Sequence, residues 1–373
     1  MKPFLLLMVA CAVAFAADET PPAPTYKSSP VKRVFKTGLV KPRELKAGPV
    51  DQTYRLQANK LPGKFHLSER AELSGIFDQG NCGSCVYNAV TKMVQDQYRL
   101  NGVVLPELSR QYTMDCSAEW SCNGSYAALV AGGMVKKGGT ATAASYPYRA
   151  RDQACAGTNA LYGKIKNPRT IDRSAKSIMS ALFDNHPVTV TVAANSSWMN
   201  YASGIYNGCN STATNHQVLI YGWDCETSVD AEGYCVFNDK GYPVNGDGYA
   251  IVPNSWGYSW GDQGEMKTRW LGKNGKFCNN IAEEATIVDL DGVTPTPTPT
   301  PTPIPKVDGG WSQWSAWSVC TNGYRDSSRT CTNPAPSGGG ANCVGASLKT
   351  EPCKEACSGF LCGIACWLPW CER

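Results

Sequence analysis

The chain has 373 residues, 42% of them hydrophobic, and a formal net charge of +4 at pH 7. This length exceeds one typical domain, and the hydrophobic content supports a buried core. The small net charge argues against a dedicated nucleic-acid-binding protein, and no apolar run reaches the ~18 residues that a membrane span needs. We expect no cofactor and no metal centre.

The N-terminus has the pattern of a secretory signal peptide. Lys2 precedes an apolar stretch, and Ala14-Phe15-Ala16 is a small-x-small cleavage site, so residues 1–16 are the predicted signal peptide. Lipidation at Cys11 is an alternative that the short apolar stretch before it disfavours. We expect a secreted protein, with the periplasm or a lysosome-like compartment as alternatives.

Residues 17–56 are proline-rich, basic and without periodicity, and are expected to be a pro-region or N-terminal extension. Residues 79–85 then read Gln-Gly-Asn-Cys-Gly-Ser-Cys, and apolar residues recur at helical spacing from there to residue 100. A thiol in the first turn of a helix feels the positive end of the macrodipole, which favours the nucleophilic thiolate. The structural alternative is that Cys85 is half of a disulfide.

Helical character continues at residues 125–137, whereas residues 188–192, 217–221 and 249–252 have the β-branched, apolar composition of strands. Helices followed by strands predict an α+β fold of two subdomains. A cleft between a helical part and a β-rich part would be the natural position for a site.

A Thr-Pro repeat in residues 293–306 predicts an extended polyproline II linker. Nine cysteines lie between residue 82 and the linker, and eight lie after it. Cysteines of exported proteins are normally paired. The body before the linker therefore holds one cysteine that is left over or bridges to another chain.

A cysteine nucleophile usually needs a base, and the chain has only three histidines. His216 begins a predicted strand, where its ring can be held rigidly. Asn254 follows another predicted strand, and its carbonyl can orient an imidazole without adding charge. Trp256 beside it can keep water away from that hydrogen bond.

These segments together resemble the papain (C1) family of cysteine peptidases, over about residues 60–290. The resemblance rests on residues 79–85, on Asn215-His216-Gln-Val, and on Asn-Ser-Trp-Gly from Asn254. It is extended by matching segments at residues 108–116, 121–124, 146–148 and 203–206. It implies a two-subdomain papain-like fold with the active-site cleft between a helical and a β-rich part.

The resemblance also implies a role for each residue. Cys85 would attack the peptide carbonyl, His216 would act as base and acid, and Asn254 would orient His216. Gln79 and the backbone N–H of Cys85 would form the oxyanion hole. The implied substrate-binding residues are Gly124, Ser125, Asn215, Trp256 and Glu284, with Ser125 standing where the family usually has glycine.

Glu283 and Glu284 lie near the floor of the main specificity pocket implied by the resemblance, and a carboxylate there would favour arginine or lysine in the substrate. The alternative is a solvated pair of surface carboxylates. The implied disulfides are Cys82–Cys122, Cys116–Cys155 and Cys209–Cys278, and Cys225 and Cys235 remain to bridge a hairpin insertion. Cys85 is then the unpaired cysteine.

The tail resembles a thrombospondin type 1 repeat over residues 307–357, followed by a cysteine-rich end at 358–373. The resemblance rests on tryptophans at every third position followed by arginines and cysteines. It implies cation–π layers and a glycan, cell-surface or matrix partner bound through Trp311, Trp314, Trp317 and Arg329. A stabilising cap is the alternative.

The sequence therefore predicts a monomeric, secreted cysteine endopeptidase, with its catalytic domain at residues 57–292 and an adhesive tail. Polypeptides are the expected substrates. One competing hypothesis is a peptidase relic that acts as a binding protein. Another is a transpeptidase that uses the same acyl-enzyme chemistry with an amine acceptor.

Overall fold

The computed structural model of the chain describes residues 27–29, 34–41, 50–51, 53, 60–117, 121–158, 160–273, 275–294, 307–320, 323–334 and 340–353. The predicted signal peptide, most of the predicted linker and the C-terminal end at 358–373 lie outside these residues. Within the described part of the chain, no helix combines the length and the apolar composition that crossing a membrane requires.

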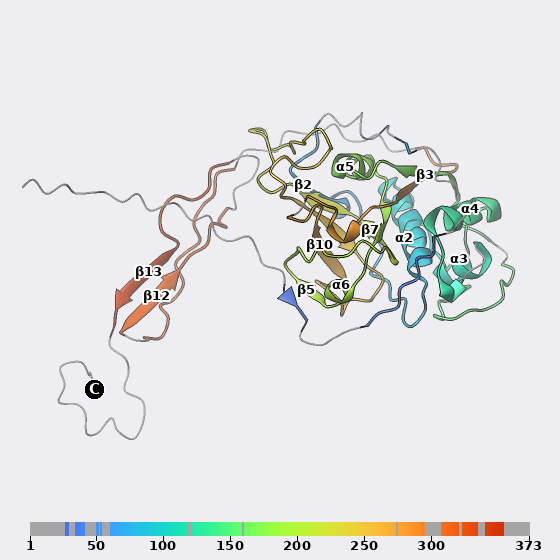
Figure 1. Cartoon of the computed structure of the whole chain (residues 1–373), viewed down its shortest axis with the longest axis horizontal. Coiled ribbons are helices and arrows are strands. Elements are labelled where there is room, and N and C mark those ends of the chain that lie inside the picture. The colour runs from blue at the N-terminus through green and yellow to red at the C-terminus, as the bar shows by residue number, and fades with distance from the viewer. Residues whose placement is uncertain are drawn as a thin grey trace, which may run out of the picture.

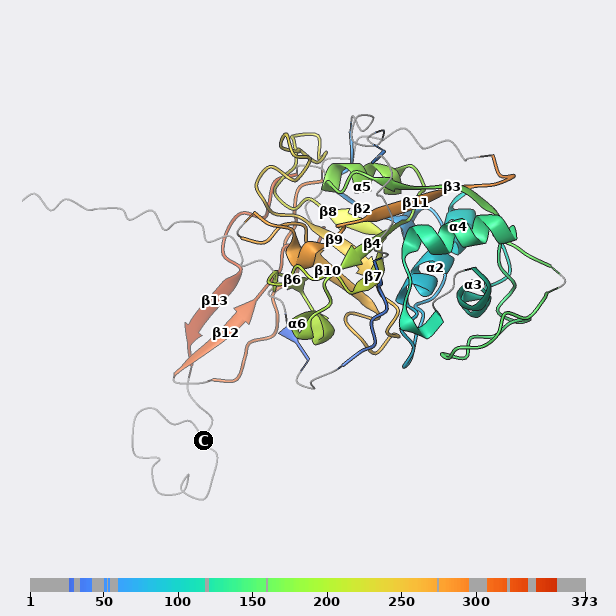
Figure 2. The same cartoon turned by 45° about the vertical axis from the view of Figure 1, so that its right-hand side comes forward.

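Three helices form one side of the body: α2 (Cys85–Leu100), α3 (Arg110–Ser117) and α4 (Ala127–Lys137). Figure 1 shows α2 between the strands and the other two helices, and the turned view of Figure 2 agrees. The helix predicted at 85–100 is confirmed, and the one predicted at 125–137 begins two residues later. The sequence reading did not identify α3 as a helix.

The central helix α2 is buried on every side. Arg99 is half-buried, and all other residues of the helix are buried. Burial of its polar residues is tolerated because they are paired. Lys92 lies 3.2 Å from Asp96 and donates to Gly75 O at 3.0 Å. Tyr221 of the β-rich side donates its hydroxyl hydrogen to Asp96. A buried charge without such partners would be strongly unfavourable, so this cluster ties the helix to the strands.

The β-rich side contains two sheets. The five-stranded sheet has the order β2 (Lys64–His66), β8 (Gly222–Asp224), β9 (Tyr249–Pro253), β10 (Glu265–Arg269) and β6 (Ile205–Tyr206). The four-stranded sheet has the order β3 (Ile165–Ile171), β11 (Ala285–Leu290), β4 (Val188–Val192) and β7 (His216–Ile220). Neighbouring strands are antiparallel except β6 and β10.

Of the strands that the sequence predicted, β4 and β9 lie inside their sheets, and β7 lies at the edge of the four-stranded sheet. β4, β7 and β9 match the predicted ranges within one residue, and every residue of the three is buried. Strands buried on both faces read as continuous apolar runs, which made them easy to recognise. The α+β fold with a helical and a β-rich part is confirmed.

Short helices complete the body. They are α5 (Ala175–Phe183), α6 (Ser196–Met199) and the 3₁₀ helices η1 (Leu67–Glu69), η2 (Ser121–Asn123) and η3 (Cys278–Asn280). The side chains of Ser174 and Asn195 accept backbone hydrogen bonds at the starts of α5 and α6. Such N-caps satisfy donors that have no partner inside the helix.

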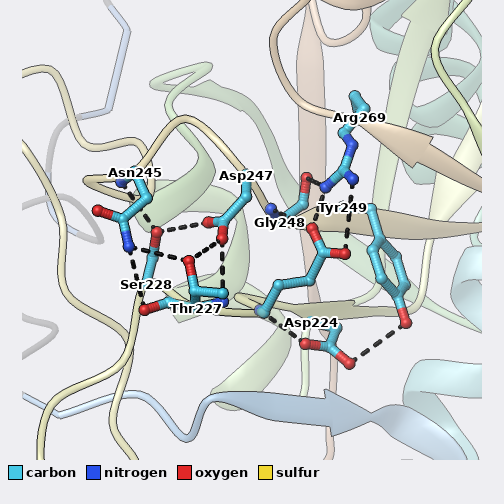
Figure 3. A network of polar contacts seen from close by, with 9 residues as sticks. Asp224, Thr227, Ser228, Asn245, Asp247, Gly248, Tyr249 and Arg269 are labelled. Carbon is cyan, nitrogen blue, oxygen red and sulfur yellow. Dashed lines mark hydrogen bonds and ion pairs between the residues drawn. The ribbon is translucent and has the colours of Figure 1, made fainter. Parts of the chain in front are cut away.

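The loop between β8 and β9, residues 225–248, is held by half-buried carboxylates (Figure 3). Asp247 accepts a hydrogen bond from the hydroxyl of Ser228 at 2.5 Å. Glu226 forms an ion pair with Arg269 of β10. These contacts fix a long insertion to the sheet although it has little secondary structure of its own.

Six disulfides lie in the described part of the chain. Four are in the body and are the pairs expected from the sequence: Cys82–Cys122, Cys116–Cys155, Cys209–Cys278 and Cys225–Cys235. Two are in the tail: Cys320–Cys353 and Cys331–Cys343. Among the described cysteines, Cys85 alone is unpaired.

Two small antiparallel pairs lie outside the main sheets. Near the N-terminus, β1 (Lys27–Ser28) pairs with β5 (Tyr201–Ser203) of the body. In the tail, β12 (Tyr324–Ser328) pairs with β13 (Leu348–Pro352). The tail is too small for a large apolar core, so its two disulfides supply cross-links that such a module needs.

Candidate active site

Cys85 is the first residue of α2 and is 0% exposed. Backbone N–H groups of Gln217, Gly38, Val86 and Cys85 itself point at its sulfur. Burial nevertheless raises the pKa of the thiol to about 11, and these hydrogen bonds only partly offset it. The thiolate expected from the position at the helix start is therefore not the stable form in this structure, because burial outweighs the helix terminus.

His216 begins β7, and its ring is held on two sides. Its Nε2 lies 2.9 Å from Oδ1 of Asn254, which follows β9. The indole of Trp256 stacks on the imidazole with ring centroids 4.5 Å apart. The other ring nitrogen, Nδ1, is buried and has no hydrogen-bond partner among the described residues. This leaves Nδ1 available to the thiol, whose sulfur is contacted by the next residue of the strand.

The imidazole is neutral in this arrangement. Burial lowers the pKa of His216 to about 4, although the hydrogen bond to Asn254 acts in the opposite direction. A buried imidazolium would lack the solvation that stabilises its charge. Cys85 and His216 are thus both uncharged in this structure.

Gln79, the side chain expected to stabilise the oxyanion, is fully buried and hydrogen-bonded at both ends of its amide. Its Nε2 donates to the carbonyl oxygen of Lys36 at 3.0 Å and to that of Cys82 at 2.8 Å. Its Oε1 accepts a hydrogen bond from the hydroxyl of Ser255 at 2.6 Å, which fixes the orientation of the amide. One of the two acceptors of Nε2 is thus the carbonyl of Lys36, far from Gln79 in the sequence.

That carbonyl belongs to residues 34–41, a segment that lies across the catalytic residues. Ser125 donates its N–H to Gly38 O at 2.8 Å and accepts from Val40 N–H at 2.9 Å, and Leu39 N–H donates to Asn215 O at 3.1 Å. The ring of Phe35 stacks on Trp256 at 4.5 Å, with an interplanar angle of 8°. The segment thus binds both the helical and the β-rich side, and the backbone of its Gly38 contacts the thiol of Cys85.

Glycines allow the segment to approach so closely. A Cβ on Gly38 would lie 1.7 Å from Gly83 O, and one on Gly124, whose φ is +105°, would lie 2.3 Å from Gly38 O. Neither position can hold a side chain without moving backbone.

The remaining predicted residues are those that lie against segment 34–41 and the two neighbouring glutamates. Gly124, Ser125 and Asn215 contact segment 34–41 through their backbones or lie against it. Glu284 is 6% exposed and is bonded to Thr286 Oγ1 at 3.1 Å, and burial raises its pKa. Glu283, its neighbour, forms an ion pair with Lys41 of the segment.

Residues 34–41 are the part of the site that the sequence reading missed. Their bonds to Gln79, Ser125 and Asn215 come from backbone groups, which every residue type possesses. Phe35 against Trp256 is the main side-chain contact. The sequence signal was therefore limited to one glycine and one aromatic residue in an aperiodic stretch.

Comparison with known proteins agrees with this geometry. A sequence profile described as papain family cysteine protease matches residues 61–288. The viral cathepsin of Heliothis zea nuclear polyhedrosis virus is 30% identical over 227 residues, which are 60% of this chain and 56% of that protein. The cathepsin L-like proteinase of Fasciola hepatica is 30% identical over 240 residues, 63% of this chain and 67% of that protein.

A solved structure has the same fold. The recombinant stem bromelain precursor superposes with a TM-score of 0.56 and 25% identity, over 69% of this chain and 78% of that chain. The chain matches only 56% to 67% of the length of the two curated relatives above. The matched region contains Gln79, Cys85, His216 and Asn254. This chain belongs to the papain family of cysteine proteases.

Proposed function

We propose that this chain is a cysteine endopeptidase made as an inactive precursor, in which residues 34–41 cover the catalytic pair. One observation supports it above all: the single unpaired cysteine of the described chain begins α2, and its thiol is contacted by the backbone of Gln217, which directly follows the histidine held by Asn254 at 2.9 Å. A nucleophile, a base and a group that orients the base are the arrangement that acyl transfer requires.

The reaction follows from these groups once the segment has left. The thiolate of Cys85 attacks the carbonyl carbon of a peptide bond, and His216 protonates the amine that leaves. Water then hydrolyses the thioester, with His216 acting as base. The amide of Gln79 and the N–H of Cys85 stabilise the oxyanion, and losing one such donor typically costs ~2.7–4 kcal/mol of transition-state stabilisation.

The precursor form rests on the contacts of segment 34–41. The amide of Gln79 donates a hydrogen bond to the Lys36 carbonyl, and the ring of Phe35 stacks on Trp256. A substrate therefore cannot contact these groups at the same time. Other residues of the N-terminal region also attach to the body, at positions remote from the site. Asp51 accepts a hydrogen bond from Arg169 Nε at 3.0 Å, and β1 pairs with β5.

The proposal includes a preference for a basic residue at the second position before the scissile bond. Glu283 accepts hydrogen bonds from Lys41 and from Thr214, and Lys41 directly follows the residues that pair with Ser125. Burial raises the pKa of Glu283, but these hydrogen bonds outweigh it and the net shift is downward. A basic side chain of the chain itself thus already pairs with this carboxylate. Glu284, the residue first expected here, lies more deeply buried.

The tail is proposed to be a thrombospondin type 1-like module that binds glycans or surfaces. Arg329 lies 4.3 Å from the ring centroid of Trp311 and 4.4 Å from that of Trp314, and Lys349 lies 4.0 Å from Trp314. Alternating cations and indoles are the layers that the resemblance implied. Secretion is supported by the predicted signal peptide and by six disulfides in the described residues, since disulfides persist in oxidising compartments.

Covalent labelling tests the enzymatic proposal. The chain is treated with an epoxysuccinyl thiol inhibitor before and after limited proteolysis that removes the residues preceding position 57, and the adduct is mapped by mass spectrometry. We expect an adduct on Cys85 after processing, and hydrolysis of a short peptide that Cys85→Ala abolishes. Processed protein without an adduct on Cys85, or a Cys85→Ala variant with full hydrolysis, would contradict the proposal.

A further inference from the structure

A small cavity lies next to Asn254, the residue that is hydrogen-bonded to His216. It has a volume of about 10 Å³ and is lined by α2, by β7 beyond His216 and by the chain that follows β9. The residues that line it include Gln217 and Asn254. The cavity therefore touches the asparagine that holds the imidazole.

Two buried polar atoms of this lining are unpaired. Asn254 is 4% exposed and Gln217 is 1% exposed, and neither Nδ2 of the first nor Oε1 of the second has a hydrogen-bond partner in the described part of the chain. The other end of each amide is bonded. Asn254 Oδ1 accepts from His216 and from the N–H of Ser255 at 2.7 Å, and Gln217 Nε2 donates to Thr189. Both amides are thus oriented with their free atom unsatisfied.

The two free atoms are chemically complementary, because one is a donor and the other an acceptor. Leaving a buried polar group unpaired costs about 1–3 kcal/mol. A single ordered water needs roughly 10–15 Å³ and two to four polar partners. The cavity offers this volume and at least two partners.

We propose that one ordered water occupies this cavity, accepts a hydrogen bond from Asn254 Nδ2 and donates one to Gln217 Oε1. Gln217 is then a positioning residue for the proposed peptidase reaction. It acts on His216 through the water and Asn254, because the water fixes the amide orientation that directs Oδ1 at the imidazole.

Gln217 can contact both the thiol and the proposed water because of its place in β7, directly after His216. Its backbone N–H forms a hydrogen bond to the thiol of Cys85, and the same residue lines the cavity. One residue thus contacts the nucleophile directly and the orienting asparagine through water.

Crystallography tests the water without reference to activity. A crystal structure of the full chain at a resolution that shows ordered water is expected to contain one water within hydrogen-bond distance of both Asn254 Nδ2 and Gln217 Oε1. A cavity without such a water would overturn the proposal, even in a fully active enzyme.

Kinetics of the processed enzyme test the positioning role. Gln217→Met keeps the size of the side chain and removes the acceptor, and Gln97→Met is the matched control. Gln97 is a buried glutamine of α2 that donates to Val288 O at 3.0 Å, also has an unpaired Oε1, and does not line the cavity.

We expect Gln217→Met to lower kcat about tenfold with KM within twofold. The alkaline limb of its rate profile should move to lower pH, because a weaker bond from Asn254 stabilises the imidazolium less. Gln97→Met should leave kcat and the pH profile unchanged. Equal kinetic effects of the two substitutions, or a change of KM alone, would overturn the positioning role. Inactive wild-type enzyme would contradict the proposed function instead, while the crystallographic outcome would stand on its own.

Discussion

The protonation state of the catalytic pair depends on what covers it. With residues 34–41 in place, burial raises the pKa of Cys85 to about 11 and lowers that of His216 to about 4. Both groups are then neutral at pH 7. Uncovering them restores solvent to the charged forms, and the helix start and the nearby imidazole can then favour the thiolate.

This predicts a large difference in thiol reactivity between the precursor and the processed enzyme. Alkylation by iodoacetamide requires the thiolate, so a thiol with its pKa raised by two units should react roughly 100-fold more slowly at pH 7 than an ordinary one. We expect the precursor rate to rise with pH up to about pH 11 and the processed enzyme to react readily at pH 7. Identical pH profiles for the two forms would show that the segment does not control the thiol.

Glu283 and Glu284 make separable predictions about specificity. Glu283 faces the basic residue of the covering segment, whereas Glu284 is buried and hydrogen-bonded to Thr286. In a peptide library, Glu283→Gln should reduce the preference for arginine or lysine two residues before the cut by about tenfold, since 1.4 kcal/mol corresponds to that factor. Glu284→Gln, of equal size and charge change, should retain the preference. The reverse result would assign the pocket to Glu284.

The predictability of these residues follows from how each one makes its contacts. Cys85 and His216 stood out because one cysteine was left unpaired and only three histidines were available. Gln217 and Lys36 did not stand out. The free amide oxygen of Gln217 matters only because several elements pack around it to form the cavity, and the sequence does not show this packing. Lys36 contributes a backbone carbonyl, which every residue type has. Contacts made by the backbone have no signature in the sequence.

At the scale of elements, the five-residue strands buried at every position were predicted, whereas strands with a mixture of buried and exposed residues were not. β4 and β7 are buried at every position, whereas β3 has only its first and last residues buried, and its middle reads as polar. α3 was missed because its sequence, Arg-Gln-Tyr-Thr-Met-Asp-Cys-Ser, has little apolar periodicity. Tertiary contacts rather than local propensity place both elements.

Segment 34–41 is the element proposed to control access to the site, and its Gly38 lies in close contact with Gly83 of the body. Because an added Cβ would lie 1.7 Å from Gly83 O, Gly38→Ala should push the segment away from the thiol. We expect the unprocessed variant to be labelled by the epoxysuccinyl inhibitor at a rate near that of the processed enzyme.

Lys36→Ala is the matched control for this element. Its side chain is exposed, and the contacts with Gln79 and Trp256 are made by its carbonyl, which the substitution keeps. The control precursor should therefore resist labelling as the wild type does. If Gly38→Ala resisted equally, the covering role of the segment would be refuted.

At the scale of the whole molecule, the tail should affect where the enzyme acts rather than how it cleaves. The described tail residues form their own cation–π layers, strands and disulfides. A module with its own internal contacts can bind a surface and raise the local concentration of the enzyme there. Such an effect changes the cleavage of surface-bound substrates and leaves the catalytic residues as they are.

Arg329→Gln in the full, processed chain tests this division. Arg329 contacts two indoles, so its loss removes both a positive charge and a layer of the stack. We expect kcat/KM on a short soluble peptide to stay within twofold of the wild type, and retention on a heparin column, used as a polyanionic glycan probe, to fall to lower salt. Lys136→Gln removes the same charge from an exposed position on α4 and should change retention little. If both substitutions weaken retention equally, binding follows net charge alone, and the tail has no specific role in it.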